Sequence, residues 1–297
     1  MALVLLNPHA RGGRARALAA GLQSELTRLD ATATLLVPES VAQARTLITA
    51  AARGQRVVVV GGDGTLHQLL PALLAGAHET ALVPAGSGDD SARAFGLHGL
   101  PWPEALAFAL TAPALPTDIG EVQTEHETRP FISSLAVGFD AAVAQRALRG
   151  PAWLTGMPRY LLATLQEVAR LSLCNINVSV DGQELHRGPA LFASALNTPS
   201  YGGGMPAVPH ACIDDGRLDL LLAGSFTRMG TLLMLPRLLL GRHLGHVRVR
   251  SESCMALRID SVRPLPLAAD GEALRGAGQV VMTVRAAGMR VVRLSSP

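Results

Sequence analysis

Short apolar runs alternate with longer amphipathic segments over the first 117 residues. The apolar runs are rich in β-branched or leucine residues and are too short for ordinary helices, so they predict buried strands. The segments between them carry apolar residues at helical spacing, and Ser40 is a suitable N-cap for one of them. We expect strands at 2–8, 31–38, 57–60 and 80–86, and helices at 15–29, 40–53 and 66–74. This alternation predicts a doubly wound parallel sheet covered by helices.

The pattern changes near residue 117. Beyond it, β-like segments follow one another, separated by glycine, aspartate and proline, with one helical stretch near 158–171. Consecutive strands favour an antiparallel, sandwich-like domain over further βαβ units. The segments are 116–124, 129–139, 176–186, 189–198, 216–225, 246–260 and 278–294. The sequence therefore predicts an α/β chain with a parallel-sheet domain at 1–117 and a β-rich domain at 118–297, leaving open whether the last strand packs back on the first domain.

Composition narrows the chemistry. The chain has 297 residues, 48% hydrophobic and 16% charged, which excludes a disordered protein. Every basic residue is arginine, so mechanisms that need a lysine, such as the Walker A loop or a Schiff base, are excluded. A net charge of +3 is too small to indicate a nucleic-acid partner.

The cysteines and the apolar stretches indicate in which cellular compartment the protein is expected. Cys174, Cys212 and Cys254 are widely spaced and odd in number, which argues against a disulfide framework and against a zinc site. The first residues lack the basic region of a secretory signal, and polar residues interrupt the apolar stretch 218–240, so we expect neither a signal peptide nor a membrane span. A cytoplasmic protein fits these features.

The run of valines at 57–60 ends at the sequence GGDGT, residues 61–65. In an open parallel sheet, ligands bind beyond the carboxyl ends of the strands. We expect Gly61, Gly62 and Gly64 to allow positive φ and close approach of a phosphate, with Thr65 adding a hydroxyl. Asp63 can meet a magnesium ion or position a hydroxyl group. The alternative is a tight turn capped by the aspartate. Two neighbouring strand ends, at 6–13 and 83–97, also carry small and hydrogen-bonding residues, which favours a phosphate-binding cleft.

Several motifs, in this order, resemble the diacylglycerol kinase catalytic family, in particular bacterial lipid kinases related to sphingosine kinases and, more distantly, to NAD kinases. Besides GGDGT they are AGSGDDSAR at 85–93, TDIG at 117–120, AVGFDAAV at 136–143, YGGGMPAVPHACIDDGRLDL at 201–220 and ADGE at 269–272. The resemblance covers nearly the whole chain. It implies a nucleotide-binding domain followed by a lipid-substrate domain.

The resemblance also implies roles for individual residues. Glu272 would be the general base, helped by Asp270, and Asp63 would face the magnesium-bound phosphates. ATP would contact Asn7, Ser40, Gly61, Gly62, Asp63, Gly64, Thr65, Leu66, His67, Gln68 and Ser87. A structural magnesium ion would use the Asp215 side chain, with main-chain oxygens of Cys212 and Arg217. Taken alone, ADGE is more commonly a hairpin turn, and an Asx-type turn is the alternative for the 212–217 segment.

Departures from the family pattern keep alternatives open. His67 and Gln68 stand where the family has Asn and Glu, and Ser87, Asp89 and Ser91 replace its Thr, Asn and Phe. The leading hypothesis is an ATP- and magnesium-dependent kinase that phosphorylates a primary hydroxyl of diacylglycerol or a related lipid. A NAD kinase-like enzyme and a catalytically weak nucleotide- or lipid-binding homologue are the alternatives.

A lipid substrate calls for contact with a membrane surface. Two stretches combine apolar residues with arginines and no carboxylate, at 145–160 and at 228–250. Such segments can lie on an anionic leaflet, which predicts peripheral membrane association. A buried amphipathic helix with solvated arginines is the alternative for the second stretch. A homodimer is left open.

Overall fold

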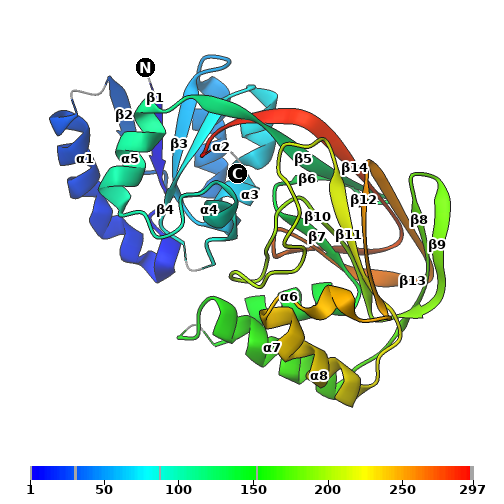
Figure 1. Ribbon diagram of the computed structural model, residues 1–297. Helices are drawn as coiled ribbons and strands as arrows, with labels where there is room; N and C mark the ends of the chain where they lie inside the picture. The colour runs from blue at the N-terminus through cyan, green and yellow to red at the C-terminus, as the bar shows by residue number, and fades with distance from the viewer. Residues whose placement is uncertain (1, 30–31, 87, 152, 295–297) are drawn as a thin grey trace. The chain divides into compact units, whose positions relative to one another are not determined.

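The computed structural model describes residues 2–29, 32–86, 88–151 and 153–294. The chain divides into two compact units, Met1–Thr117 with Ala287–Pro297, and Asp118–Ala286. We call them the first and the second unit and describe each by itself. Their helices and strands are labelled in Figure 1.

Five parallel strands form the sheet of the first unit. Their order is β2–β1–β3–β4–β14, and β14 takes part through Arg290–Val292, which pair with Glu79–Ala81. The strands are β1 (Ala2–Leu6), β2 (Ala33–Leu36), β3 (Arg56–Gly61), β4 (Glu79–Pro84) and the end of β14 (Glu272–Val292). Buried apolar side chains on both faces of β1, β3 and β4 explain why these strands lack a polar alternation.

Helices cover both faces of this sheet. Helices α1 (Leu18–Arg28) and α5 (Trp102–Thr111) pack on the face that carries Val58 and Val60. Figure 1 shows α2 (Val41–Ala50) and α3 (Asp63–Ala75) on the other side, and a short α4 (Asp90–Ala94) follows β4. The predicted parallel-sheet α/β architecture is confirmed.

Helix boundaries differ from the prediction in two places. A 3-10 helix, η1 (Ala10–Ala17), occupies the start of the helix expected at 15–29. Helix α3 begins at Asp63, three residues before its predicted start, and continues through Pro71. An aspartate in the first turn favours the helix because its charge faces the positive end of the helix dipole. The GGDGT motif is therefore a strand end joined to a helix start.

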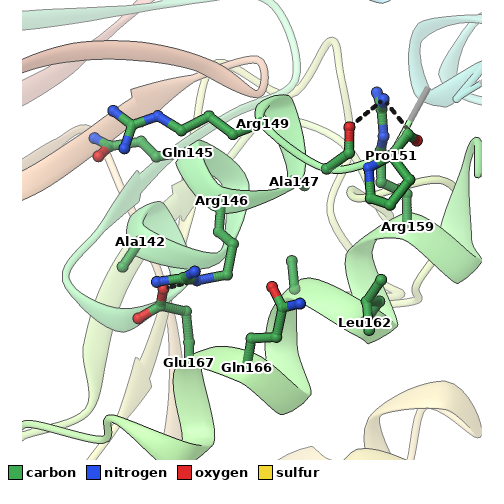
Figure 2. Close-up of a pocket in the computed structure, with 12 residues that line it drawn as sticks. Ala142, Gln145, Arg146, Ala147, Arg149, Pro151, Arg159, Leu162, Gln166 and Glu167 are labelled. Carbon is green, nitrogen blue, oxygen red and sulfur yellow. Dashed lines mark hydrogen bonds and ion pairs between the residues drawn. The ribbon is translucent and has the colours of Figure 1, made fainter.

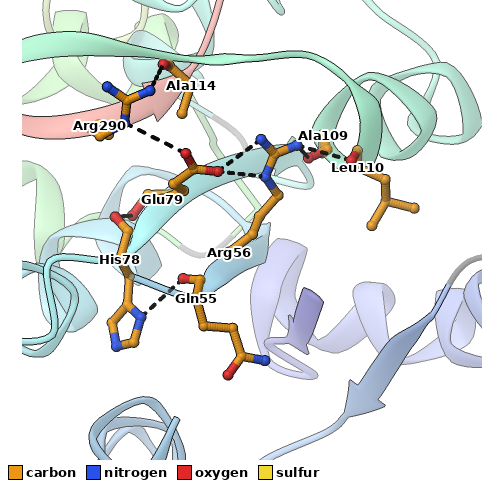
Figure 3. A network of polar contacts seen from close by, with 9 residues as sticks. Gln55, Arg56, His78, Glu79, Ala109, Leu110, Ala114 and Arg290 are labelled. Atoms are coloured by element: carbon orange, nitrogen blue, oxygen red, sulfur yellow. Dashed lines mark hydrogen bonds and ion pairs between the residues drawn. The ribbon is translucent and has the colours of Figure 1, made fainter. Parts of the chain in front are cut away.

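A polar network holds together the amino ends of β3 and β4, opposite the edge where their carboxyl ends lie. Arg56 donates to Glu79 and to the carbonyls of Ala109 and Leu110. Arg290, at the end of β14, lies 3.5 Å from Glu79 and donates to Ala114 O (Figure 3). The network ties the last strand of the chain to the first unit.

The second unit is built on antiparallel strands, in the order β12–β11–β10–β7–β13–β14. A β8–β9 hairpin pairs with β13, and β5 pairs with β6. The strands are β5 (Ala114–Thr124), β6 (Thr128–Phe131), β7 (Ser134–Val137), β8 (Cys174–Val180), β9 (Gln183–Ala190), β10 (Phe192–Leu196), β11 (Leu218–Ala223), β12 (Val249–Cys254), β13 (Ala256–Ala269) and β14. Leu135, Leu220 and Leu267 lie in its buried core. This confirms the predicted β-rich second part.

The second unit holds more helix than the sequence pattern predicted. Helix α7 (Met157–Ala169) corresponds to the expected stretch, but α6 (Phe139–Leu148) and α8 (Arg228–Leu239) accompany it, and Figure 1 shows the three lying together. The segment at 129–139 was expected to be one strand. Gly138, with φ +88°, ends β7, and α6 begins one residue later. Among the described residues, no helix is long and apolar enough to cross a membrane.

Candidate functional site

Three strand ends meet at the carboxyl edge of the first unit's sheet. Asn7, just after β1, donates its backbone N–H to Val60 O and its side-chain amide to the Thr65 hydroxyl at 2.7 Å. The N–H of Ala85, just after β4, donates to Gly61 O. The structure thus brings together the loops after β1, β3 and β4, as expected for parallel strands.

The glycines of GGDGT act through close packing. Gly61 and Gly62 do not adopt positive φ, and Gly64 lies inside α3, so the predicted left-handed turn is wrong. A Cβ on Gly62 would lie 2.7 Å from Gly86 Cα, and a Cβ on Gly61 would lie 2.8 Å from the Thr65 side chain. The chain after β3 crosses the chain after β4 so closely that only glycine fits.

Asp63 is held by the loop after β4. Its carboxylate accepts from Ser91 N at 2.8 Å through Oδ1 and from Asp90 N at 3.1 Å through Oδ2. The side chain therefore satisfies two amides at the start of α4, and the capping role considered from the sequence is present. A carboxylate offers about four acceptor positions, so two bonds leave room for a further ligand.

The other residues predicted to bind nucleotide occupy different positions. Ser40 is exposed, and its hydroxyl accepts from Gln43 N, which confirms it as the N-cap of α2. Leu66 is buried. Gln68, like His67, lies in α3, and its backbone oxygen accepts from Arg45. Ser87 lies outside the described residues.

Asp89, which replaces the asparagine of the family pattern, precedes α4 in the left-handed conformation at φ +58°. Asparagine and aspartate tolerate this region better than other residues with a side chain. The substitution keeps a residue suited to this backbone and adds a negative charge near Gly86.

The ADGE motif forms a tight hairpin in the second unit. Asp270 and Gly271 both have positive φ, +48° and +83°, and Ala269 pairs with Glu272 across the turn. This is the two-residue turn typical of Asp-Gly between antiparallel strands. The Asp270 carboxylate accepts from the N–H groups of Ile132, Ser133 and Ser134 at 2.7 to 3.2 Å. The turn is anchored by its own aspartate.

Buried polar groups support the segment that holds Asp270. The side-chain amide of Asn197 donates to Asp118 O and Ile132 O at 2.9 Å each. The hydroxyls of Ser133 and Thr198 lie 2.7 Å apart. No sequence signal marked Asn197 or Thr198, because two polar residues directly after an apolar strand are as typical of a loop as of a functional site.

Glu272 contrasts with Asp270. It is half-buried, and among the described residues none makes a hydrogen bond or ion pair with its carboxylate. A Cβ on Gly271 would lie 3.0 Å from the Tyr160 hydroxyl, so this tyrosine of α7 packs against the turn beside Glu272. Sequence analysis missed Tyr160, which lies far from the motif along the chain.

The predicted cation loop contains the Asx-type turn. Asp215 is exposed, and its Oδ1 accepts from Arg217 N at 2.9 Å. Cys212 Sγ lies 3.0 Å from Asp214 Oδ1. The neighbouring Gly216 N donates to the buried Asp118 carboxylate at 2.6 Å, which fixes the loop to the TDIG segment. Within the described part of the chain, no group of three or more His, Cys, Asp or Glu side chains could hold a metal.

The remaining motifs have structural explanations. In YGGG, the three glycines all have positive φ, and a Cβ on Gly203 would lie 2.7 Å from Met157 N. Asp140, in AVGFDAAV, accepts hydrogen bonds from the Ser194 and Tyr201 hydroxyls. Burial raises the pKa of Asp140 to about 6, although these hydrogen bonds act in the opposite direction.

Two family models match the chain. Residues 1–122 match the diacylglycerol kinase catalytic domain, and residues 133–293 match the YegS C-terminal NAD kinase beta sandwich-like domain. A similar curated protein is a diacylglycerol kinase of Mycobacterium tuberculosis, 32% identical over 81% of this chain and 78% of its own length. Another, from Pseudomonas fluorescens and named "Probable lipid kinase YegS-like", is 31% identical over 96% and 91%.

A solved structure has the same fold. A diacylglycerol kinase from Bacillus anthracis superposes with a TM-score of 0.74, covering 99% of this chain and 96% of its own, at 16% sequence identity. At this identity the likeness concerns the fold alone.

Proposed function

Because this chain belongs to the diacylglycerol kinase family of lipid kinases, we propose that it transfers the γ-phosphate of ATP, with Mg²⁺, to a primary hydroxyl of diacylglycerol or a related lipid. The observation that carries this proposal is the hairpin at Asp270–Gly271. It fixes one carboxylate with three amides and leaves the neighbouring Glu272 carboxylate without a partner among the described residues.

The first unit would bind the nucleotide. Gly62 and Gly86 cross closely, neither has a side chain of its own, and both are half-buried; Asn7 and Thr65 lie beside the crossing. Backbone amides at the carboxyl edge of a parallel sheet are suited to phosphates, and the chain has no lysine for this task. We assign ATP contacts to Asn7, Ser40, Gly61, Gly62, Asp63, Gly64, Thr65, Leu66, His67, Gln68 and Ser87.

The residues present fit a magnesium ion that arrives with the nucleotide. Magnesium commonly takes one or two carboxylates together with substrate phosphates and waters, so it needs no cluster of protein side chains. Asp63 would hold it through the acceptor positions that its two amide bonds leave open. Bound there, the ion would neutralise charge on the phosphates.

The second unit would supply the base. The Glu272 carboxylate would accept the proton of the lipid hydroxyl while the hydroxyl oxygen bonds to the γ-phosphorus and the bond from that phosphorus to ADP breaks. Asp270 would keep the turn in place through its three amide bonds. Positioning and charge neutralisation supply most of the catalysis in phosphoryl transfer.

We also propose a structural Mg²⁺ at the loop 212–217. The Asp215 side chain would bind it together with main-chain oxygens of Cys212 and Arg217. The support is an exposed carboxylate that, among the described residues, has only one oxygen engaged, on a loop fixed by Asp118. Oxygen ligands completed by waters suit this ion.

Helix α8 supports peripheral contact with the cytoplasmic leaflet of a membrane. Met229, Leu233 and Leu240 are 65%, 66% and 68% exposed and recur at helical spacing on one side. Arg237 and Arg242 are also exposed there. An exposed apolar stripe flanked by cations fits an anionic lipid surface.

Transfer is tested with labelled ATP, Mg²⁺ and a panel of diacylglycerol, monoacylglycerol, sphingosine and NAD. We expect label in a lipid product and a fall of about a hundredfold or more in kcat for Glu272→Gln, as expected when a general base is removed. Glu252→Gln removes an exposed glutamate in the same unit and serves as the control. Label in NADP would support a NAD kinase instead, and nucleotide binding without transfer would support a catalytically weak homologue.

Membrane contact is tested separately by vesicle sedimentation. Charge reversal at Arg237 and Arg242 should weaken binding to anionic vesicles, whereas reversal of the exposed Arg285 should not. Unchanged binding of the double variant would reject α8 as the contact.

A further inference from the structure

A cavity of about 330 Å³ lies between α6 and α7 in the second unit, apart from the hairpin that holds Glu272. Figure 2 shows its lining, which includes Arg146, Arg149 and Arg159 and one carboxylate, Glu167. The formal charge of these four side chains is +2. This volume is at the lower end of the range for ligand pockets and can hold a phosphate with a short ester group.

The three arginines differ in what balances their charge. Arg146 forms an ion pair with Glu167. Arg159 donates only to neutral groups, Gly150 O and Pro151 O, both at 3.1 Å, and its buried Nε has no hydrogen-bond partner among the described residues. Arg149 extends from the end of α6 (Figure 2). Its backbone N–H donates to Arg146 O, but none of the described residues makes a hydrogen bond or ion pair with its guanidinium.

Two guanidinium groups beside a cavity, with no carboxylate paired to either in the described part of the chain, favour an anion. Arginine suits phosphate because its planar fork can donate two parallel hydrogen bonds to two oxygens. The surroundings indicate where such an anion would come from. Trp153 is 80% exposed and Leu148 46% exposed, and both are close in sequence to the arginines. Tryptophan beside cations is typical of protein surfaces that meet lipid headgroups.

We propose that the α6–α7 cavity is a phosphate-ester site that takes the headgroup of an anionic phospholipid through Arg149, with Arg159 adding positive charge from the opposite side of the lining (Figure 2). The site is additional to the proposed catalytic groups, and it does not rest on phosphoryl transfer. It would hold a lipid that is not consumed and fix part of the second unit at the membrane surface.

The first test measures binding of glycerol 3-phosphate and inorganic phosphate to the full chain by calorimetry. Arg149→Gln should weaken binding of glycerol 3-phosphate by about tenfold or more, since each lost charge-assisted contact to phosphate is large on this scale. Arg170→Gln, which removes an exposed arginine at the other end of α7, should leave it unchanged. Comparing these two variants separates this cavity from any phosphate site in the first unit.

The second test identifies the source of the phosphate. Phosphatidylglycerol vesicles should shift Trp153 fluorescence to shorter wavelength, with the Trp153→Phe spectrum subtracted, and Arg149→Gln should reduce the shift. Phosphatidylcholine vesicles should give none. Soluble ester binding that depends on Arg149, without a vesicle response, would support the site and overturn the headgroup. If neither ligand depends on Arg149, the arginine serves only the negative end of the α6 dipole, and the proposal is wrong.

Discussion

Two of the chain's Asp-Gly steps, Asp63-Gly64 in the first unit and Asp270-Gly271 in the second, place the same two residues in different backbones. In the first unit, Asp63 and Gly64 form the first turn of helix α3. In the second, Asp270 and Gly271 form a hairpin turn with both residues at positive φ. Each aspartate accepts hydrogen bonds from backbone amides distant in sequence, those of Asp90 and Ser91 in one case and those of residues 132–134 in the other.

The comparison shows that the same dipeptide is compatible with different backbone conformations. The residues that pack around it decide which conformation it adopts. Before Asp63, the glycine at 62 is required by the approach of Gly86. After Asp270, the glycine at 271 is required by its own left-handed conformation. In both places the aspartate fixes a loop, so its structural role and any chemical role are carried by the same side chain.

The largest effect on stability is expected for Asp270→Ala. It leaves three amides without their acceptor, and we expect a loss of about 3 kcal/mol in the free energy of unfolding. Asp270→Asn, which suits the left-handed backbone and keeps one acceptor oxygen, should recover about half. Urea denaturation measures both. Equal stability of the alanine variant and the wild type would show that the anchor is unimportant.

Asp63→Ala should lower the free energy of unfolding by less, about 2 kcal/mol, because only two amides lose their acceptor. Asp63→Asn separates structure from chemistry, since it keeps an acceptor but removes the charge. We expect it to fold with near-normal stability while kcat falls at least tenfold if Asp63 acts on the metal-bound phosphates. Full activity of the asparagine variant would leave this aspartate only the loop-fixing role.

A third carboxylate, that of Asp140, differs from both because it is buried and accepts hydrogen bonds from hydroxyl groups instead of backbone amides. The pKa of Asp140 is about 6 in the folded protein, against an ordinary value of 3.8 for an aspartate in water. Over that interval the folded state binds more protons than the unfolded state, so stability falls as pH rises from about 4 to about 6 and then levels off. Asp140→Asn removes this dependence, and its free energy of unfolding should exceed that of the wild type by about 2 to 3 kcal/mol above about pH 6, with a smaller difference toward pH 4. Thermal unfolding at several pH values checks this, and parallel curves for the two proteins would contradict it.

The smallest effects distinguish the two glycines. Gly62→Ala should cost about 1.5 kcal/mol because its Cβ meets backbone at 2.7 Å, and Gly271→Ala should cost about 1 kcal/mol through backbone strain. Gly245→Ala, whose Cβ would meet nothing within 4 Å, is the control. Replacement by asparagine separates the causes. Gly271→Asn should be tolerated better than Gly271→Ala, whereas Gly62→Asn should be worse than Gly62→Ala.

Much of the first unit could be predicted from the sequence. The apolar runs at β1, β3 and β4 are buried on both faces, and their periodicity differs from that of the helices between them. The convergence of Asn7, Thr65 and the loop after β4 follows from parallel strands ending at one edge. The predicted start of α3 was three residues too late, because a glycine-rich motif is compatible both with a loop and with the first turn of a helix.

The second unit was less predictable. Helix α6 follows β7 after a single glycine, so an apolar run that is half strand and half helix resembled one strand. Asn197, Ser133 and Thr198, which support the Asp270 turn, belong to short polar pairs that match no motif. Their role in holding the Asp270 turn follows from hydrogen bonds to residues distant in sequence.

By itself, the sequence determined buried strands where β-branched residues run together and helices where apolar residues recur every three or four positions, and it offered a hairpin at Asp270–Gly271 as one of two interpretations. Only the tertiary structure decided that Gly62 serves close packing, that three distant amides hold Asp270, and that no carboxylate among the described residues pairs with the Arg149 guanidinium. The physical reason is that local propensity acts over a few residues. Close packing and the satisfaction of buried polar groups depend on segments that meet only in the folded chain.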